Sequence, residues 1–451
     1  MSSYYDIAGL QDDNDPTYPG GGGGTTPGSQ TTTTPSADGF NQMSEGEGGK
    51  LALAFGRHIA IGHLAEWQNF PSADPPYILA TYLHGEGPWQ ECEKAWYAVD
   101  TQVVPQSANA TDVGWHFHPG TQSSGTGDPV QGVDSFTPAS ITYNKTAYSV
   151  VKLPQKYAAE QRPDKYRGRF KCLLVPNYNS SGTQTDAGSY SANPARVAIY
   201  LLIVQGKLAT SRIDWPSWVA WRDYCDATLS WNDGTTTHTI PRFEAHPAFT
   251  DVVEVPDALD ICCGLSCTRW QDDGEKFRFL LPTDTTVQHT FTSENIVLGK
   301  ITVEPSDIQS APRHIVAKFL DVLDEYFTEG SVEQRFESLI DAYGDRVDTR
   351  AFVNMNHSQA QRIVAYQMRL ETEYSYFVRL IGDGSSIHLL QGDFVAIAVG
   401  DIHTDGNYLV VDASDYSPES TPDERNFRLQ KITGALYSDS DHRPIQRPVT
   451  S

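Results

Sequence analysis

Two histidines in the W-H-F-H segment, residues 115–118, are the first side chains whose type and spacing could do chemistry. In an extended segment, His116 and His118 project from the same face, and two imidazoles on one face can share a metal ion. No third ligand is identifiable, and Pro119 and Gly120 end the run at once. The favoured interpretation is therefore a turn of aromatic and histidine side chains packed on its own domain, without a metal.

A second candidate metal site is the cysteine cluster Cys262, Cys263 and Cys267. Closely spaced thiolates can hold zinc or an iron–sulfur cluster, but the spacing here is C-C-x-x-x-C and contains no C-x-x-C pair. On a helix, Cys263 and Cys267 would lie one turn apart beside Leu259, which favours buried apolar packing. The chain has six cysteines, too few for a disulfide scaffold, and a cytoplasmic origin favours free thiols.

The common catalytic signatures are missing from the sequence. The Gly-, Ser- and Asp-rich stretch 123–134 lacks the order and the lysine of a phosphate-binding loop, and neither H-E-x-x-H nor G-x-S-x-G occurs. Asp272 and Asp273 are explained by a turn before Gly274. We expect no enzyme activity and no cofactor. A pair of carboxylates at glycosidase separation is invisible in sequence, so a virion-associated polysaccharide hydrolase stays open as an alternative.

Four tryptophans, at positions 215, 218, 221 and 231, raise a further alternative. Indole rings can stack on sugars, so a glycan-binding adhesin is possible in principle. However, Trp215, Trp218 and Trp221 recur at helical spacing, which favours packing between domains.

Net charge restricts the partners of the chain. The 451 residues include 33 Lys and Arg and 57 Asp and Glu, which gives a net charge of −24. Such a surface repels phosphate backbones, so we expect no specific nucleic-acid binding, although an acidic wall would suit a conduit through which DNA slides. Mean hydropathy is −0.42 and no apolar run reaches the ~20 residues that cross a bilayer. The first 18 residues do not resemble a signal peptide, so synthesis in the host cytoplasm is expected.

Changes in composition divide the chain into five segments. The first, residues 1–49, is expected to be a flexible arm because it contains seven acidic and no basic side chains and five consecutive glycines. The other expected segments are a first β-rich domain at 50–185, a helical α/β middle domain at 186–300, a second β-rich domain with a helix at 301–415, and a polar tail at 416–451. In the tail, residues 427–432 could add an edge strand. The length itself indicates two to four packed units.

Local patterns predict the elements within these segments. Helices are expected from Pro194, from Asp214 with Pro216, from Pro256 to about Trp270, and from a capping box formed by Ser358 and Gln361. Turns are expected at 85–88, 232–234 and 271–274, the last joining a helix to a strand. Strands are expected at 51–60, 77–84, 89–104, 148–153, 277–281, 376–381, 387–389, 394–399 and 408–411.

Several dispersed motifs resemble bacteriophage tail-tip or baseplate central hub proteins. The first is the loop W-H-F-H-P-G-T-Q-S-S-G-T-G-D-P-V-Q-G-V-D at 115–134, together with the G-E-G-P turn at 85–88. The middle of the chain adds S-A-N-P-A-R-V at 191–197, R-I-D-W-P-S-W-V-A-W-R-D-Y-C-D at 212–226 and S-C-T-R-W-Q-D-D-G-E-K-F-R-F-L at 266–280. Later motifs are S-Q-A-Q-R at 358–362 and G-D-F-V at 392–395. Together they cover about residues 50–400, in the order that the family has them.

This resemblance implies an α+β, β-rich, multi-domain fold: β-barrel-like hub domains with an inserted helical α/β region. It also implies a homotrimer at the virion tail tip that surrounds the DNA channel. The implied partners are the distal tail protein, the tape-measure protein, and tail fibre or spike proteins. The candidate interface residues are Trp115, His116, His118, Asp128, Gln131, Trp215, Trp218 and Trp221.

Overall fold

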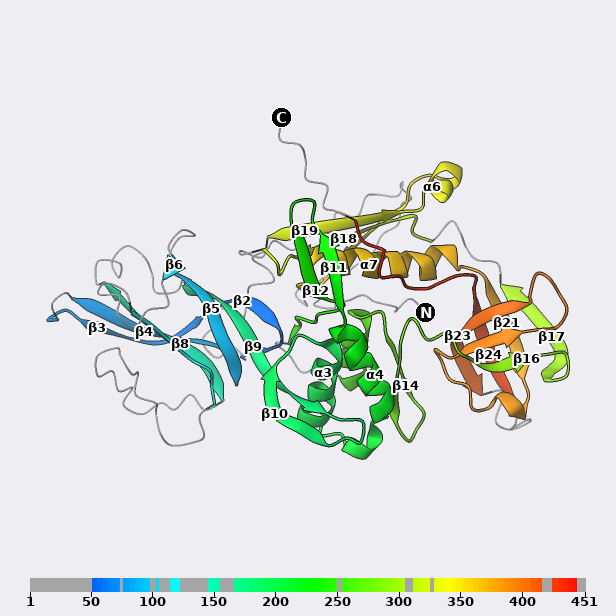
Figure 1. Ribbon diagram of the computed structural model, residues 1–451, viewed down its shortest axis with the longest axis horizontal. Coiled ribbons are helices and arrows are strands. Elements are labelled where there is room, and N and C mark those ends of the chain that lie inside the picture. Colours follow the sequence, from blue (N-terminus) through cyan, green and yellow to red (C-terminus); the bar gives the residue numbers. More distant parts are fainter. Residues whose placement is uncertain are drawn as a thin grey trace, which may run out of the picture.

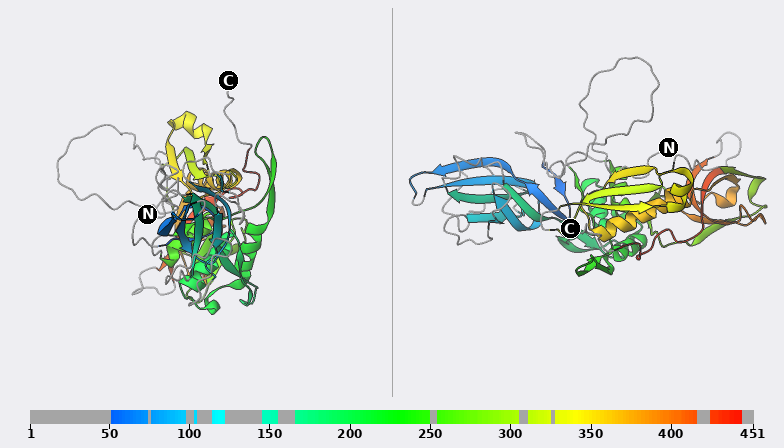
Figure 2. Two further views of the ribbon diagram at one scale, coloured as in Figure 1. Left: turned by 90° about the vertical axis from the view of Figure 1, so that its left-hand side faces the viewer. Right: turned by 90° about the horizontal axis from the view of Figure 1, so that it is seen from above.

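The computed structural model describes residues 51–73, 76–97, 103–104, 114–121, 145–154, 166–249, 254–304, 311–324, 328–415 and 424–443. They form an elongated body with a β-sheet at either end and helices in the centre (Figures 1 and 2). The fold is α+β and β-rich with several separate sheets, which confirms the predicted fold class. Among the described residues, no helix combines the length and the apolar character needed to span a bilayer. The expected arm at 1–49 lies outside the described residues.

The first β region contains two antiparallel sheets. One has the order β10 (Gln184–Tyr190), β9 (Tyr166–Tyr178), β5 (Trp89–Tyr97) and β6 (Val103–Val104), with β2 (Arg57–Ile61) also pairing with β9. The other has the order β3 (His63–Phe70), β4 (Tyr77–Glu86), β8 (Thr146–Pro154) and β7 (Gly114–His118). The G-E-G-P segment joins β4 to β5, and these two strands enter different sheets. It is therefore the point where the chain passes from one sheet to the other.

The central region contains the three predicted helices. They are α3 (Pro194–Ile199), continued by a π-helical turn at Tyr200–Gln205, then α4 (Trp215–Asp226) and α5 (Val255–Gly264). Asn193 caps α3 because its side chain accepts a hydrogen bond from the Ala195 N–H, and Pro194 occupies the first turn. The expected turn at 232–234 connects β11 (Thr228–Asn232) to β12 (Thr237–Pro241). A short pair, β1 (Leu53–Ala54) with β13 (Ala248–Phe249), links this region to the first sheets.

The third helix is shorter than predicted. It ends at Gly264, and Cys267 then adopts a left-handed backbone with φ of 55°. Trp270 therefore lies on β14 (Arg269–Asp272), which pairs with β15 (Phe277–Leu280), so the turn at 271–274 joins two strands and not a helix to a strand. Apolar spacing did not reveal this end, because residues 265–269 are buried whether or not they are helical.

A three-stranded sheet lies beside the helices. Its order is β19 (Glu329–Arg335), β18 (His314–Leu320) and β20 (Val347–Ala351), antiparallel on one side and parallel on the other. The connection from β19 to β20 contains α6 (Glu337–Tyr343), and α7 (His357–Met368) runs along the sheet (Figure 1). The residue that caps α7 is Asn356, whose side chain accepts from the Gln359 N–H. The predicted capping box at Ser358 was therefore misplaced by two residues, and Ser358 is buried inside the helix.

The far end of the molecule is a curved six-stranded sheet with its own apolar core. Its order is β16 (Val287–Phe291), β22 (Phe394–Ile397), β23 (Gly406–Asp415), β24 (Arg425–Ile432), β21 (Phe377–Gly382) and β17 (Ile296–Glu304). β24 was expected at an edge, but it lies inside between β23 and β21. The expected strand at 387–389 is not formed, because a 3₁₀ turn at Gly384–Ser386 precedes it.

The sheets draw on residues from both sides of the expected domain boundaries. The boundaries at 185 and 300 fall inside β10 and β17, and the expected tail from residue 416 supplies β24. A single buried apolar cluster extends from Ala54 through the central helices to Tyr437. The first β region, the helices and the three-stranded sheet therefore share one core, to which the six-stranded sheet contributes Phe394, Leu409 and Ile432. Other buried residues of the six-stranded sheet form a second core of its own.

Candidate functional site

The sequence-predicted interface residues of the first β region are only partly described. Asp128 and Gln131 lie outside the described residues, and so do the side chains of Trp115 and His116 on β7. The side chain of His118 is 3% exposed and stacks on Tyr148, with ring centroids 4.3 Å apart and planes at 11°. His118 thus packs β7 on β8, and its expected place on an interface is corrected to a place inside this sheet region.

The three tryptophans of α4 are inside the protein. Trp215 is 7% exposed, and Trp218 and Trp221 are 0% exposed. The Trp218 indole N–H donates to the Ala195 carbonyl at 2.8 Å, and the Trp221 N–H donates to Ser266 Oγ at 2.9 Å. Their proposed place on an interface is thereby corrected to a place in the core, where they fasten α4 to its neighbours. Trp231 is also buried, so none of these four indoles offers a face to a sugar.

The six cysteines are buried and free. Burial raises the pKa of the Cys262 thiol to about 12 and the pKa values of Cys172, Cys225, Cys263 and Cys267 above their ordinary value. Protonated thiols are poor nucleophiles and poor metal ligands. In the described part of the chain, no group of three His, Cys, Asp or Glu side chains is arranged to hold a metal ion.

A buried polar junction around β2 joins the first β region to the central region. The Arg57 N–H donates to His246 Nδ1 at 3.0 Å, and the Phe55 N–H donates to the Pro247 carbonyl at 2.9 Å. His58 lies between the Phe55 carbonyl, 3.0 Å from its Nε2, and the Asn354 amide nitrogen, 3.3 Å from its Nδ1. Because a backbone N–H can only donate, Nδ1 of His246 must be unprotonated.

Both junction histidines are held neutral by their surroundings. Burial lowers the pKa of His58 to about 4. Burial, followed by the charges of His58 and Arg57, lowers the pKa of His246 well below its ordinary value. Gly56, between β1 and β2, has φ of +69°, and a Cβ there would lie 2.2 Å from His246 Nδ1. The close approach of β2 to His246 therefore requires glycine at this position.

Helix α7 connects the junction to the rest of the core through side chains that point inward. Gln359 is fully buried, and its amide oxygen accepts from the Glu244 N–H while its amide nitrogen donates to the carbonyls of Glu244 and Leu265. Three of its polar contacts are thus to backbone groups that would otherwise be unpaired. The motif S-Q-A-Q-R at 358–362 is therefore a bracing element of the core.

Arg362 is the least expected residue of this core because its side chain is 0% exposed. One guanidinium nitrogen donates to Tyr437 Oη at 2.7 Å, another donates to the Arg242 carbonyl at 2.7 Å, and Nε donates to the Ser358 carbonyl at 3.2 Å. The guanidinium also lies 4.8 Å from the centroid of the Phe243 ring. All of its described contacts are uncharged, so its hydrogen bonds and the aromatic ring stabilise the buried cation.

The residues that follow β24, 433–443, form an extended segment that we call the C-terminal strap. It returns from the six-stranded sheet along α7 to the central region (Figure 1). Arg369, the residue directly after α7, makes two hydrogen bonds to Asp441, at 2.6 and 2.9 Å. Arg242 makes two to Asp439, at 2.9 and 3.0 Å. Paired hydrogen bonds of this geometry between Arg and carboxylate are among the stronger ion pairs. The strap thereby ties the six-stranded sheet to the shared core.

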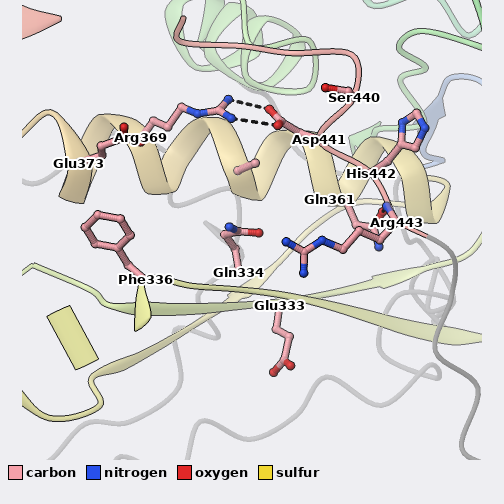
Figure 3. Close-up of a pocket in the computed structure, with 11 residues that line it drawn as sticks. Glu333, Gln334, Phe336, Gln361, Arg369, Glu373, Ser440, Asp441, His442 and Arg443 are labelled. Carbon is pink, nitrogen blue, oxygen red and sulfur yellow. Dashed lines mark hydrogen bonds and ion pairs between the residues drawn. The ribbon is translucent and has the colours of Figure 1, made fainter. Parts of the chain in front are cut away.

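A cavity of about 240 Å³ lies between the strap, α7 and β19 (Figure 3). Arg369 and Asp441 face each other across one side, and the side chain of Glu333 points away from α7 (Figure 3). Glu373 and Arg443 also line it. Asp441 is paired with Arg369, and the Glu333 carboxylate lies 3.1 Å from His314 Nε2. Of the three acidic side chains that line the cavity, Glu373 is then the one without a described ion pair, so the cavity does not present two free carboxylates for hydrolysis.

We expect Asp441→Asn to loosen the strap. Loss of this partly exposed ion pair is expected to cost about 1–2 kcal/mol, because Arg369 keeps a hydrogen-bonding partner but loses the opposite charge. Opening of the strap would then become roughly tenfold more frequent, and chymotrypsin would cut the chain after Tyr437, within the strap, faster in proportion. Cleavage is followed by mass spectrometry. Asp223→Asn, at an exposed pair with Arg222, is the control, and equal cleavage of both variants would contradict the proposed bracing.

Arg362, His58, His246 and the strap could not be recognised in the sequence, and the reason is the same for all of them. Each makes hydrogen bonds to residues more than 70 positions away, such as Tyr437 for Arg362 and Arg57 for His246. One sign of the role of Arg362 is visible in the sequence: it stands next to Ile363 and Val364, on the apolar face of a helix.

No family model matches the chain, and no curated protein matches it in sequence. Solved structures do resemble it. A chain from the virion of a native gene transfer agent particle is 14% identical, covers 89% of this chain and 88% of its own length, and superposes with a TM-score of 0.63. A tail protein from Neisseria meningitidis MC58 (11% identity, 83% and 96% covered) and the 43 kDa tail protein of prophage MuSo2 from Shewanella oneidensis (8% identity, 86% and 99% covered) have TM-scores of 0.32 and 0.33. The first of these similarities shows a shared fold over most of both chains.

Proposed function

We propose that this chain is a structural virion protein that forms the central hub at the distal end of a bacteriophage-type tail. In this proposal it is a homotrimer around the DNA channel, and it links the tail tube and distal tail protein to fibres or a spike. The observation that carries the proposal is the fold shared over 89% of the chain with a protein from an assembled virion. The motifs from residue 85 to residue 395 support the same assignment.

The construction of the molecule suits a part that works by docking. Sheets at both ends are joined through one buried core, a junction of neutral histidines and an ion-paired strap. Obligate assemblies bury several thousand square ångströms of surface between rigid partners, so a braced body serves this purpose. Neither alternative gains support in the described residues, because the four tryptophans considered for sugar stacking are buried and the cavity has no free pair of acids.

The test is electron cryomicroscopy of purified particles, combined with the mass of the purified chain. A three-fold body at the end of the tail that fits these sheets is the expected result, with a solution mass of about three times 49.8 kDa. Absence of the chain from mature particles, or its presence as isolated single copies, would overturn the proposal. Release of reducing ends from cell-wall or capsular polysaccharide by the pure protein would favour the hydrolase.

A further inference from the structure

The connection between β19 and β20, residues 336–347, rises from the body and carries α6 at its outer end (Figures 1 and 2). We call it the α6 excursion. Helix α6 has seven residues, and none of them is buried. Isolated helices of this length are marginal in water and depend on packing for their stability. The excursion is thus a helix for which this chain provides little cover.

One side of the excursion is apolar. Phe336, Leu339, Ile340 and Tyr343 recur at spacings of three and four residues, so they share one face of the helix. Phe336 packs on the central core, and Leu339 and Ile340 are half-buried. At the outer end, Tyr343 and Val347 are each 53% exposed. The Arg313 guanidinium lies 5.7 Å from the centroid of the Tyr343 ring and covers it only in part. The apolar face therefore begins inside the protein and ends half-exposed.

Acidic side chains surround this face. Residues 333–348 contain five acidic and two basic side chains, a local net charge of −3. Arg335 lies 3.3 Å from Glu337 and 3.8 Å from Asp345, so it is already paired. Asp341, exposed on the outer turn of α6, takes part in no ion pair among the described residues.

We infer that the α6 excursion docks into an apolar groove with a basic rim on a different protein chain of the same particle. A half-exposed tyrosine beside valine is a suitable anchor, because aromatic side chains at the centre of an interface carry much of its binding energy. The charge argues against a second copy as the occupant. Two excursions face to face would bring Asp341 and Asp345 together, and each chain carries a net charge of −24. If the partner carries Lys or Arg around its groove, these basic side chains attract the acidic side chains of the excursion.

The inference rests on the proposed virion role and is tested in purified particles. Tyr343 is replaced by photoreactive benzoylphenylalanine, the particles are irradiated, and the cross-linked peptides are identified by mass spectrometry. The expected product joins this chain to another protein at an apolar segment flanked by Lys or Arg. The same replacement at Ala342, an exposed neighbour on another side of the helix, is the matched control and should cross-link much less. Tyr343→Ser should reduce the amount of that partner in the particles by roughly tenfold or more.

The outcomes separate this inference from the proposed function. Cross-links from position 343 to a second copy of this chain, or equal cross-linking from positions 342 and 343, overturn the inference and leave the virion role intact. Full retention of the partner in Tyr343→Ser particles does the same. A chain absent from the particles overturns both. An unchanged melting temperature of the purified Tyr343→Ser protein ensures that loss of the partner does not reflect misfolding.

Discussion

Arg362→Met is expected to lower the stability of the central body by about 2–5 kcal/mol, because each buried acceptor that loses its donor costs about 1–3 kcal/mol. Methionine fills a similar volume but cannot donate to Tyr437 Oη or to the Arg242 and Ser358 carbonyls. Tyr437 belongs to the strap, so the same substitution should also free the strap.

The measurement is urea unfolding followed by tryptophan fluorescence, since Trp218, Trp221 and Trp231 report on the central region. Arg278→Met is the control, because the side chain of Arg278 is 49% exposed and lies 3.9 Å from its acidic neighbour Asp273. A surface change of this kind is expected to alter stability by about 0.5 kcal/mol or less. If the two variants unfold at the same urea concentration, Arg362 does not brace the core in the way its contacts indicate.

Acidification from pH 6.5 to pH 4 is expected to weaken the fold through its buried histidines. The pKa of His58 is lowered to about 4 and that of His84 to about 3, in both cases chiefly by burial. An unfolded histidine has a pKa near 6.5, so the unfolded state binds more protons below that pH and the folded state loses relative stability as the pH falls. Each of these two residues contributes a loss of up to about 3 kcal/mol by pH 4. His246 acts in the same direction.

Burial raises the pKa of Glu244, which lies beside the same junction. This shift stabilises the folded state as the pH falls, opposite to the histidines, so the histidine effect is measured by comparing variants. In His246→Asn, the amide oxygen can still accept from the Arg57 N–H but cannot be protonated in this range. The melting temperature of this variant should fall less between pH 6.5 and 4 than that of the parent protein. His403→Asn, at an exposed loop position, should follow the parent. If the melting temperatures of all three proteins fall equally, protonation of His246 does not contribute to the loss of stability.

Much of the local structure could be predicted from the sequence. Asn193 with Pro194 marked the start of α3, and the N-D-G turn at 232–234 marked a hairpin, because caps and turns depend on a few adjacent residues. The end of α5 and the cap of α7 were misplaced, because buried apolar residues continue past the last helical turn and a cap depends on backbone geometry. The interior place of β24 was missed, since alternation identifies a strand but not its neighbours.

The sequence alone determined the β-rich class, the central helices and the lack of common catalytic motifs, since these follow from periodicity, turn residues and motif spacing. The tertiary structure decided that the α4 tryptophans are core residues, that His246 accepts from β2, and that Asp439 and Asp441 bind Arg242 and Arg369. The physical reason is that burial and ion pairing depend on which distant segments meet in space. That choice is made by the packing of the whole core, and no short stretch of the chain records it.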